Sequence, residues 1–112
     1  MRQRILMAIG GLLCVVAVAQ AGDVDKGKAL YTGRCAFCHG ATGKGEGPVG
    51  AALKPPPSNF TSTDYWKTSN DEQVKNAIKN GKPGTPMVPF GTSLSSDDIE
   101  NLLAYLKTFT PK

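Results

Sequence analysis

The sequence contains the pattern Cys-x-x-Cys-His at Cys35, Cys38 and His39, and His39 is the only histidine in the chain. On a helix, residues three or four positions apart lie on the same face, so the two thiols and the imidazole would project to one side. Two thiols placed in this way can form thioether bonds to one porphyrin edge, and the imidazole can bind the iron. The pattern predicts one covalent haem c, attached at both cysteines, with His39 as an axial ligand, and the chain must then fold around a flat apolar group.

The same residues admit other interpretations. A structural zinc site needs four nitrogen or sulfur ligands, and beyond the N-terminal segment only these three side chains are soft candidates. A thioredoxin-like redox pair belongs among alternating strands and helices, which the sequence does not indicate. A structural or redox disulfide between Cys35 and Cys38 stays open, although it would close too short a loop to constrain the unfolded chain.

The N-terminus has the features of a secretory signal. Arg2 and Arg4 precede a mostly apolar run over residues 5–19, which ends in Ala-Gln-Ala. This arrangement predicts a cleaved signal peptide over residues 1–21. The run is shorter than the roughly twenty residues that a membrane-spanning helix needs, and a retained membrane anchor is the alternative. Cys14 would leave with the signal, so no disulfide framework remains in the exported chain.

Residues 22–112 would then form one small domain of 91 residues. Removal of the two signal arginines lowers the net charge from +4 to +2, with 11 Lys and Arg against 9 Asp and Glu, and such a balance gives nucleic-acid binding no support. Gly and Pro make up 19 of these 91 residues, which predicts long loops between few regular elements. So short a chain buries little core on its own, and a bound macrocycle would supply part of it.

Three helices are expected. The first begins at Asp23 or Asp25 and leads to the haem motif, and Gly27 in its apolar stripe predicts close contact with another backbone. The second begins at Ser69, with a glutamate three residues later completing a capping box. The third begins at Ser95 and should pack on the first through a broad apolar face formed by Ile99, Leu102, Leu103 and Leu106.

Between the first two helices, residues 40–57 are expected to form a loop because Gly and Pro recur throughout. A ligating histidine normally donates its second ring nitrogen to a carbonyl, and the backbone of Gly47 or Pro48 is the expected acceptor for His39. The aromatic side chains expected to wall the haem are Phe60, Tyr65 and Trp66. The polar neighbours proposed to reach the haem propionates are Ser58, Asn59 and Thr61.

Met87 is the only methionine outside the N-terminal segment, and prolines flank it within residues 82–91. Its thioether sulfur suits an axial position on iron, where Met/His ligation raises the reduction potential. Methionine is otherwise an ordinary core residue, and that interpretation stays open. The rigid loop and the second axial position of the haem favour Met87 as an iron ligand.

With these motifs the sequence resembles the small class I c-type cytochromes over residues 22–112. The resemblance is carried by Cys-x-x-Cys-His-Gly, by the Gly-x-Gly-Pro that ends at Pro48, by Met87-x-Pro-Phe, and by Leu-Ser-x-x-Asp-Ile at the start of the last helix. Val88 separates the methionine from its proline, which the family often has adjacent. The resemblance implies an all-α cytochrome c fold of three to five helices with long loops around one covalent haem, His39/Met87 ligation, and crossing of the first and last helices.

The resemblance also implies a one-electron carrier in the periplasm of a bacterium, and not an enzyme. Its partners would be redox proteins that dock transiently, and the carrier itself is expected to be a monomer without a permanent membrane span. A peroxide- or oxygen-using haem enzyme is disfavoured because the chain has no second histidine, and Arg34 adjoins Cys35 on the proximal side. A haem subunit docked to a periplasmic oxidoreductase, or a haem sensor, stays open as an alternative.

Overall fold

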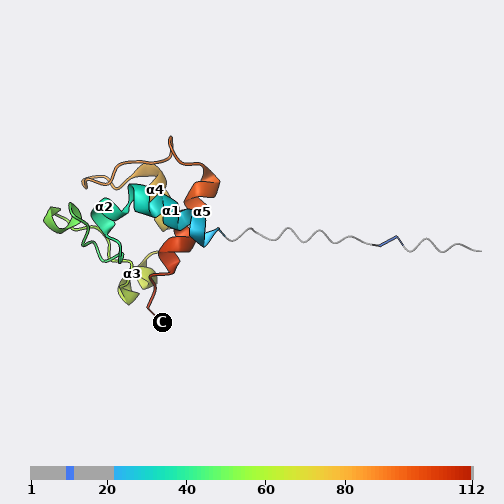
Figure 1. The fold of residues 1–112 in the computed structure, drawn as a ribbon, viewed down its shortest axis with the longest axis horizontal. Helices are drawn as coiled ribbons and strands as arrows, with labels where there is room; N and C mark the ends of the chain where they lie inside the picture. Colours follow the sequence, from blue (N-terminus) through green and yellow to red (C-terminus); the bar gives the residue numbers. More distant parts are fainter. Residues whose placement is uncertain (1–9, 12–21, 112) are drawn as a thin grey trace, which may run out of the picture.

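The computed structural model describes residues 10–11 and 22–111. This part of the chain is all-α, without strands, and long loops connect its helices (Figure 1). The elements in chain order are α1 (Val24–Arg34), α2 (Ala36–His39), the short 3-10 helix η1 (Gly50–Ala52), α3 (Thr63–Thr68), α4 (Asp71–Asn80) and α5 (Ser96–Lys107). The all-α expectation is confirmed. The predicted signal peptide lies outside the described residues apart from Gly10 and Gly11.

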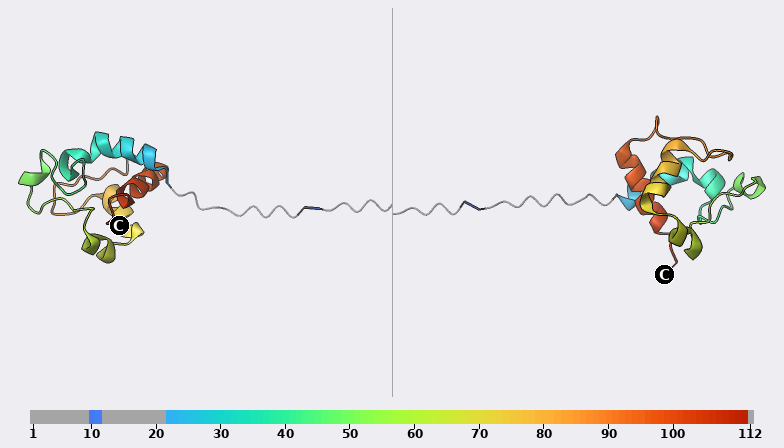
Figure 2. Two further views of the ribbon diagram at one scale, coloured as in Figure 1. Left: turned by 60° about the horizontal axis from the view of Figure 1, so that its bottom comes forward. Right: turned by 180° about the vertical axis from the view of Figure 1, so that it is seen from behind.

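Helices α1 and α5 cross and form the main helix pair of the fold (Figure 2). Asp23 caps α1 by accepting a hydrogen bond from the Lys26 N–H at 3.0 Å. A Cβ atom at Gly27 would overlap the carbonyl oxygen of Asn101, so the two backbones meet at this glycine. The buried apolar face of α5 consists of Ile99, Leu102, Leu103 and Leu106. The predicted crossing of the first and last helices is confirmed.

The chain bends at Cys35, where α1 ends and α2 begins. The Cys35 N–H donates to the Tyr31 carbonyl at 2.8 Å, and the Cys35 carbonyl accepts from the His39 N–H at 2.9 Å. Cys35 is therefore both the C-cap of α1 and the N-cap of α2. The haem motif occupies a separate turn of helix rather than the end of one continuous helix.

The capping signals were predicted well for one helix and poorly for another. Helix α5 begins with the predicted capping box, in which Ser95 and Asp98 each bond the other's backbone N–H. The capping box of α4 is formed by Asn70 and Gln73, one residue later than predicted. Ser69 instead ends α3, a helix that the sequence did not predict, and this leaves Asn70 as the first residue free to cap α4. No helix in the described residues is long and apolar enough to cross a membrane.

Candidate haem site

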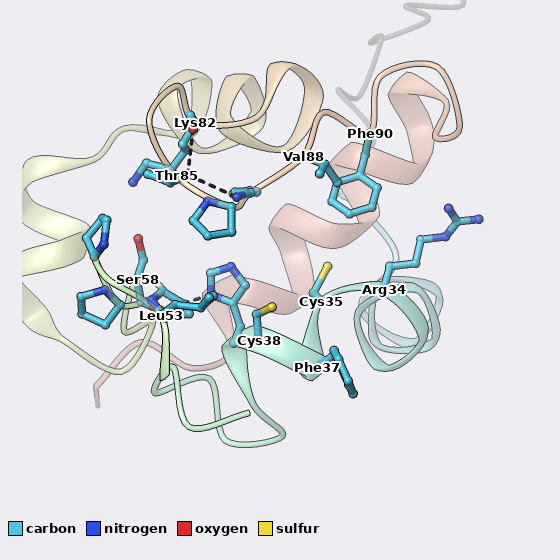
Figure 3. Close-up of a pocket in the computed structure, with 16 residues that line it drawn as sticks. Arg34, Cys35, Phe37, Cys38, Leu53, Ser58, Lys82, Thr85, Val88 and Phe90 are labelled. Carbon is cyan, nitrogen blue, oxygen red and sulfur yellow. Dashed lines mark hydrogen bonds between the residues drawn. The ribbon is translucent and has the colours of Figure 1, made fainter. Parts of the chain in front are cut away.

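A cavity of about 280 Å³ lies between α2 and the loop that connects α4 to α5 (Figure 3). Its wall is mostly apolar, with contributions from Leu53, Pro55, Pro56, Pro57, Pro86, Val88 and Phe90. The same wall contains the four donor residues that the sequence singled out, which are Cys35, Cys38, His39 and Met87. Residues up to 52 positions apart in the sequence thus meet at one apolar site.

The two cysteines and Phe37 between them all line the cavity, and the Phe37 ring extends away from the two thiols (Figure 3). They are free thiols and form no disulfide with each other. Burial raises the pKa of the Cys35 thiol to about 11, so this thiol is neutral at neutral pH. Phe37 is 64% exposed, which places a large apolar side chain on the outer surface of this helix.

His39 is largely buried, and burial lowers the pKa of its imidazole, which is therefore neutral at neutral pH. Its Nδ1 atom lies 3.3 Å from the carbonyl oxygen of Ser58. Because a carbonyl only accepts, this contact requires the proton on Nδ1 and leaves the lone pair on Nε2. That tautomer is the one that can bind a metal through Nε2.

The prediction that Gly47 or Pro48 supplies the acceptor for His39 is wrong. The loop that contains them pairs with the backbone of α2 instead: the Gly47 N–H donates to the Cys38 carbonyl at 3.2 Å, and the Val49 N–H donates to the Phe37 carbonyl at 3.1 Å. These bonds satisfy carbonyls at the end of a helix, which have no partner within it. Since the loop lies along the backbone of α2, the acceptor for the ring comes from the next segment, at Ser58.

Met87 lines the cavity from the loop between α4 and α5. Its N–H donates to Thr85 Oγ1 at 3.2 Å, and its carbonyl accepts from the Lys82 N–H at 3.3 Å. Lys82, Thr85 and Val88 in this loop lie across the cavity from Cys35 and Cys38 (Figure 3). The two predicted iron ligands therefore come from different segments that line one cavity.

The aromatic residues predicted to wall the cavity do not line it. Phe60 stacks on the ring of His39, and Tyr65 and Trp66 pack around Phe60. The aromatic residues that line the cavity are instead Phe37 and Phe90, and the sequence reasoning assigned neither of them to the wall. Of the three polar residues proposed for the propionates, only Ser58 lines the cavity. Asn59 and Thr61 bond each other instead: the Asn59 side chain accepts hydrogen bonds from the Thr61 N–H and from the Thr61 hydroxyl.

The residues present fit a covalent haem. Two thiols, a neutral imidazole and a thioether are the donors that haem c uses, and an apolar wall favours a macrocycle over water. An all-α fold built around this set of donors defines a c-type cytochrome. A family model described as "Cytochrome C oxidase, cbb3-type, subunit III" matches residues 22–106, and the chain belongs to this family of cytochromes c, which are electron carriers.

Comparisons with individual proteins agree with this family assignment. The chain is 34% identical over 90 residues to cytochrome c-554(547) of Halothiobacillus neapolitanus, covering 79% of this chain and 98% of that protein. It is 33% identical over 91 residues to cytochrome c6 of Gracilaria tenuistipitata var. liui, covering 81% and 77%. The solved structure of the KustC0563 c-type cytochrome superposes with a TM-score of 0.67 at 25% identity, covering 75% and 96%. These relatives of similar length are small electron carriers rather than enzymes.

Proposed function

We propose that this protein is a periplasmic one-electron carrier that contains one haem c, attached through Cys35 and Cys38, with His39 and Met87 as axial ligands. The observation that carries the proposal is the presence of all four side chains in the wall of one apolar cavity. When bound, the haem iron supplies reversible ferric–ferrous chemistry.

The protein contributes to this chemistry through its choice of axial ligands and by excluding external ligands and water from the iron. Two axial ligands supplied by the chain leave no position for an external ligand, so the coordination stays the same in both oxidation states. The methionine sulfur raises the reduction potential. The Ser58 carbonyl, by accepting from Nδ1, makes the imidazole of His39 a better donor. The apolar wall keeps water away from the iron.

The rim of the cavity suits a transient acidic redox partner. Arg34 and Lys82 line the cavity, and among the described residues no aspartate or glutamate does. Phe37 and Val88, which are 64% and 57% exposed, add apolar surface on either side. Charges of this kind steer encounter and lose their effect as salt increases. We expect electron-transfer rates with an acidic partner to fall steeply with ionic strength, and a salt-independent rate would contradict this part of the proposal.

Export through a cleaved signal over residues 1–21 completes the proposal, with the cytochrome domain over residues 22–112. The charged and apolar pattern of the N-terminal segment supports it, as does the start of the family match at residue 22. N-terminal sequencing of protein from the periplasmic fraction should begin at Gly22. A chain recovered from membranes with residues 1–21 intact would favour the retained anchor instead.

The proposed ligation is tested by optical spectroscopy of the purified protein. The ferric wild type should show the charge-transfer band of a methionine sulfur bound to iron, with the haem remaining on the chain after denaturation. Met87→Ala should lose the band, whereas Val88→Ala, a change at the exposed neighbour, should keep it. A high-spin ferric spectrum of the wild type would overturn the proposed ligation.

A second candidate is a haem subunit that stays docked to a larger oxidoreductase, because the matching family is described as a subunit of an oxidase. Size-exclusion chromatography of native periplasmic extract separates the two. Haem absorbance at about the mass of the single chain supports the free carrier, and co-elution with a larger complex supports the subunit.

A further inference from the structure

Phe60 is in direct contact with the proposed iron ligand His39. The two rings are stacked, with centroids 4.6 Å apart and planes 24° from parallel. Phe60 is buried, with 6% of its surface exposed. A ring packed flat against one face of an imidazole blocks rotation of that imidazole about the bond that joins it to its Cβ atom.

Phe60 is itself held firmly. Its N–H donates to the Gly43 carbonyl and its own carbonyl accepts from Trp66 Nε1–H, each at 2.7 Å. The ring of Tyr65 meets the Phe60 ring edge-on at 5.2 Å, and Phe109 lies nearly parallel to it at 6.4 Å. With both backbone groups bonded and neighbours on its ring, Phe60 presents a fixed surface to His39.

The same short segment makes a second contact with the imidazole. The Ser58 carbonyl oxygen lies 3.3 Å from Nδ1 of His39. Between the two contact residues, the Asn59 side chain accepts from the Thr61 N–H at 2.9 Å and from its hydroxyl at 2.7 Å, which closes a tight turn. This turn thus touches the imidazole at its edge, through Ser58, and at its face, through Phe60.

We propose that Phe60 is a positioning residue for His39: its ring fixes the plane of the imidazole so that Nδ1 stays directed at the Ser58 carbonyl. The proposal rests on the axial role proposed for His39. A hydrogen bond from Nδ1 to a carbonyl makes the imidazole more electron-rich, which favours ferric iron and lowers the reduction potential. Loss of the stacked ring lets the imidazole turn, weakens this bond and raises the potential.

The experiment compares Phe60→Leu with Tyr105→Leu in the haem-loaded protein. Both changes remove one ring from the same aromatic cluster, but Tyr105 packs on Tyr31 and Phe109, not on Phe60 or His39. The two readouts are the reduction potential and the spread of the haem methyl resonances in the ferric NMR spectrum. This spread depends on the orientation of the axial ligand planes. Phe60→Leu should raise the potential and change the methyl spread, and Tyr105→Leu should leave both as in the wild type.

Unchanged values in Phe60→Leu, or equal changes in both variants, would overturn the proposal and make Phe60 a core residue only. If Phe60→Leu does not fold, the wild type decides through nuclear Overhauser contacts between the ring protons of Phe60 and His39, whose absence would overturn it. Failure of the underlying ligation is distinguishable, because the wild type itself would then lack a low-spin His/Met spectrum.

Discussion

The two sides of the haem cavity are held in different ways. On the His39 side, the loop after α2 bonds the carbonyls of three successive residues of α2, and the turn at Ser58 and Phe60 holds the imidazole. On the Met87 side, the loop holds the Met87 backbone through hydrogen bonds to its near neighbours Lys82 and Thr85, and Val88 is 57% exposed. The comparison indicates that the proposed ligand His39 is fixed by contacts between distant segments, and the proposed ligand Met87 by a local turn.

The largest expected effect comes from removing the proposed covalent attachment on the His39 side. Cys35→Ala combined with Cys38→Ala should leave the chain without retained haem and largely unfolded by circular dichroism, because so small a domain depends on the cofactor for its core. Met87→Ala should retain a helical spectrum and a cooperative unfolding transition. A cooperative, folded double-cysteine variant would show that the haem does not supply the core.

Gly47→Ala probes the packing of the loop against α2. A Cβ atom at this position would overlap the Phe37 carbonyl oxygen and lie 2.5 Å from that of Ala36, and neither backbone atom can move freely. Overpacking of this kind costs about 1–3 kcal/mol, to be measured by urea denaturation. The control is Gly33→Ala in α1, where the added atom meets open space; it should stabilise the helix by roughly 0.5–1 kcal/mol. Equal effects at the two sites would remove the argument for tight packing here.

Gly84→Ala makes the matching test on the Met87 side. Gly84 has a φ of +77° but open space around the position of its Cβ atom, so the cost is backbone strain alone. That cost is about 1 kcal/mol, and the Met–iron band should survive because the loop can adjust. Loss of the band in Gly84→Ala would show that this side is held as rigidly as the other.

The smallest effect, and a pH-dependent one, is expected at Glu46 in the loop after α2. Hydrogen bonds from the Thr42 hydroxyl, and from the N–H groups of Thr42 and Lys44, lower the pKa of this carboxyl. A lowered pKa means that the carboxylate stabilises the fold above the ordinary glutamate pKa of about 4.3, and that this contribution is lost as the pH falls through the lower folded value.

Glu46→Gln should therefore lower the urea midpoint at neutral pH, and the difference from the wild type should shrink in acid. A difference that keeps its size in acid would show that the carboxylate charge is not what stabilises this loop.

The sequence predicted what local signals determine. The caps at Asp23 and Ser95, the close approach at Gly27 and the pairing of the first and last helices follow from residues near one another in the chain or from one apolar stripe. The four donor side chains were recognised from spacing and from the chemistry of sulfur and imidazole. Their meeting at one cavity agrees with that interpretation, and their roles as ligands stay predictions.

The errors arose where distant segments decide the geometry. The acceptor for His39 comes from Ser58, 19 residues away, and no local pattern marks a backbone carbonyl as an acceptor. Phe60 was expected at the cavity wall but stacks on His39 instead. The sequence has no signal that tells which flat partner an aromatic residue will stack on. Helix α3 has only six residues, too few for a periodic pattern, and Trp66 within it bonds the Phe60 carbonyl.

The anchoring of the Met87 loop has a consequence for variation and engineering. Its far end is tied to the last turn of α4, where the Phe90 N–H donates to the Ile78 carbonyl at 3.0 Å and the Gly91 N–H donates to the Lys79 carbonyl at 2.9 Å. Buried Leu94 then leads into α5. Residues 82–89 thus lie between fixed ends, and we expect that the proposed ligand Met87 can be replaced there, and the reduction potential changed, without altering α4 or α5.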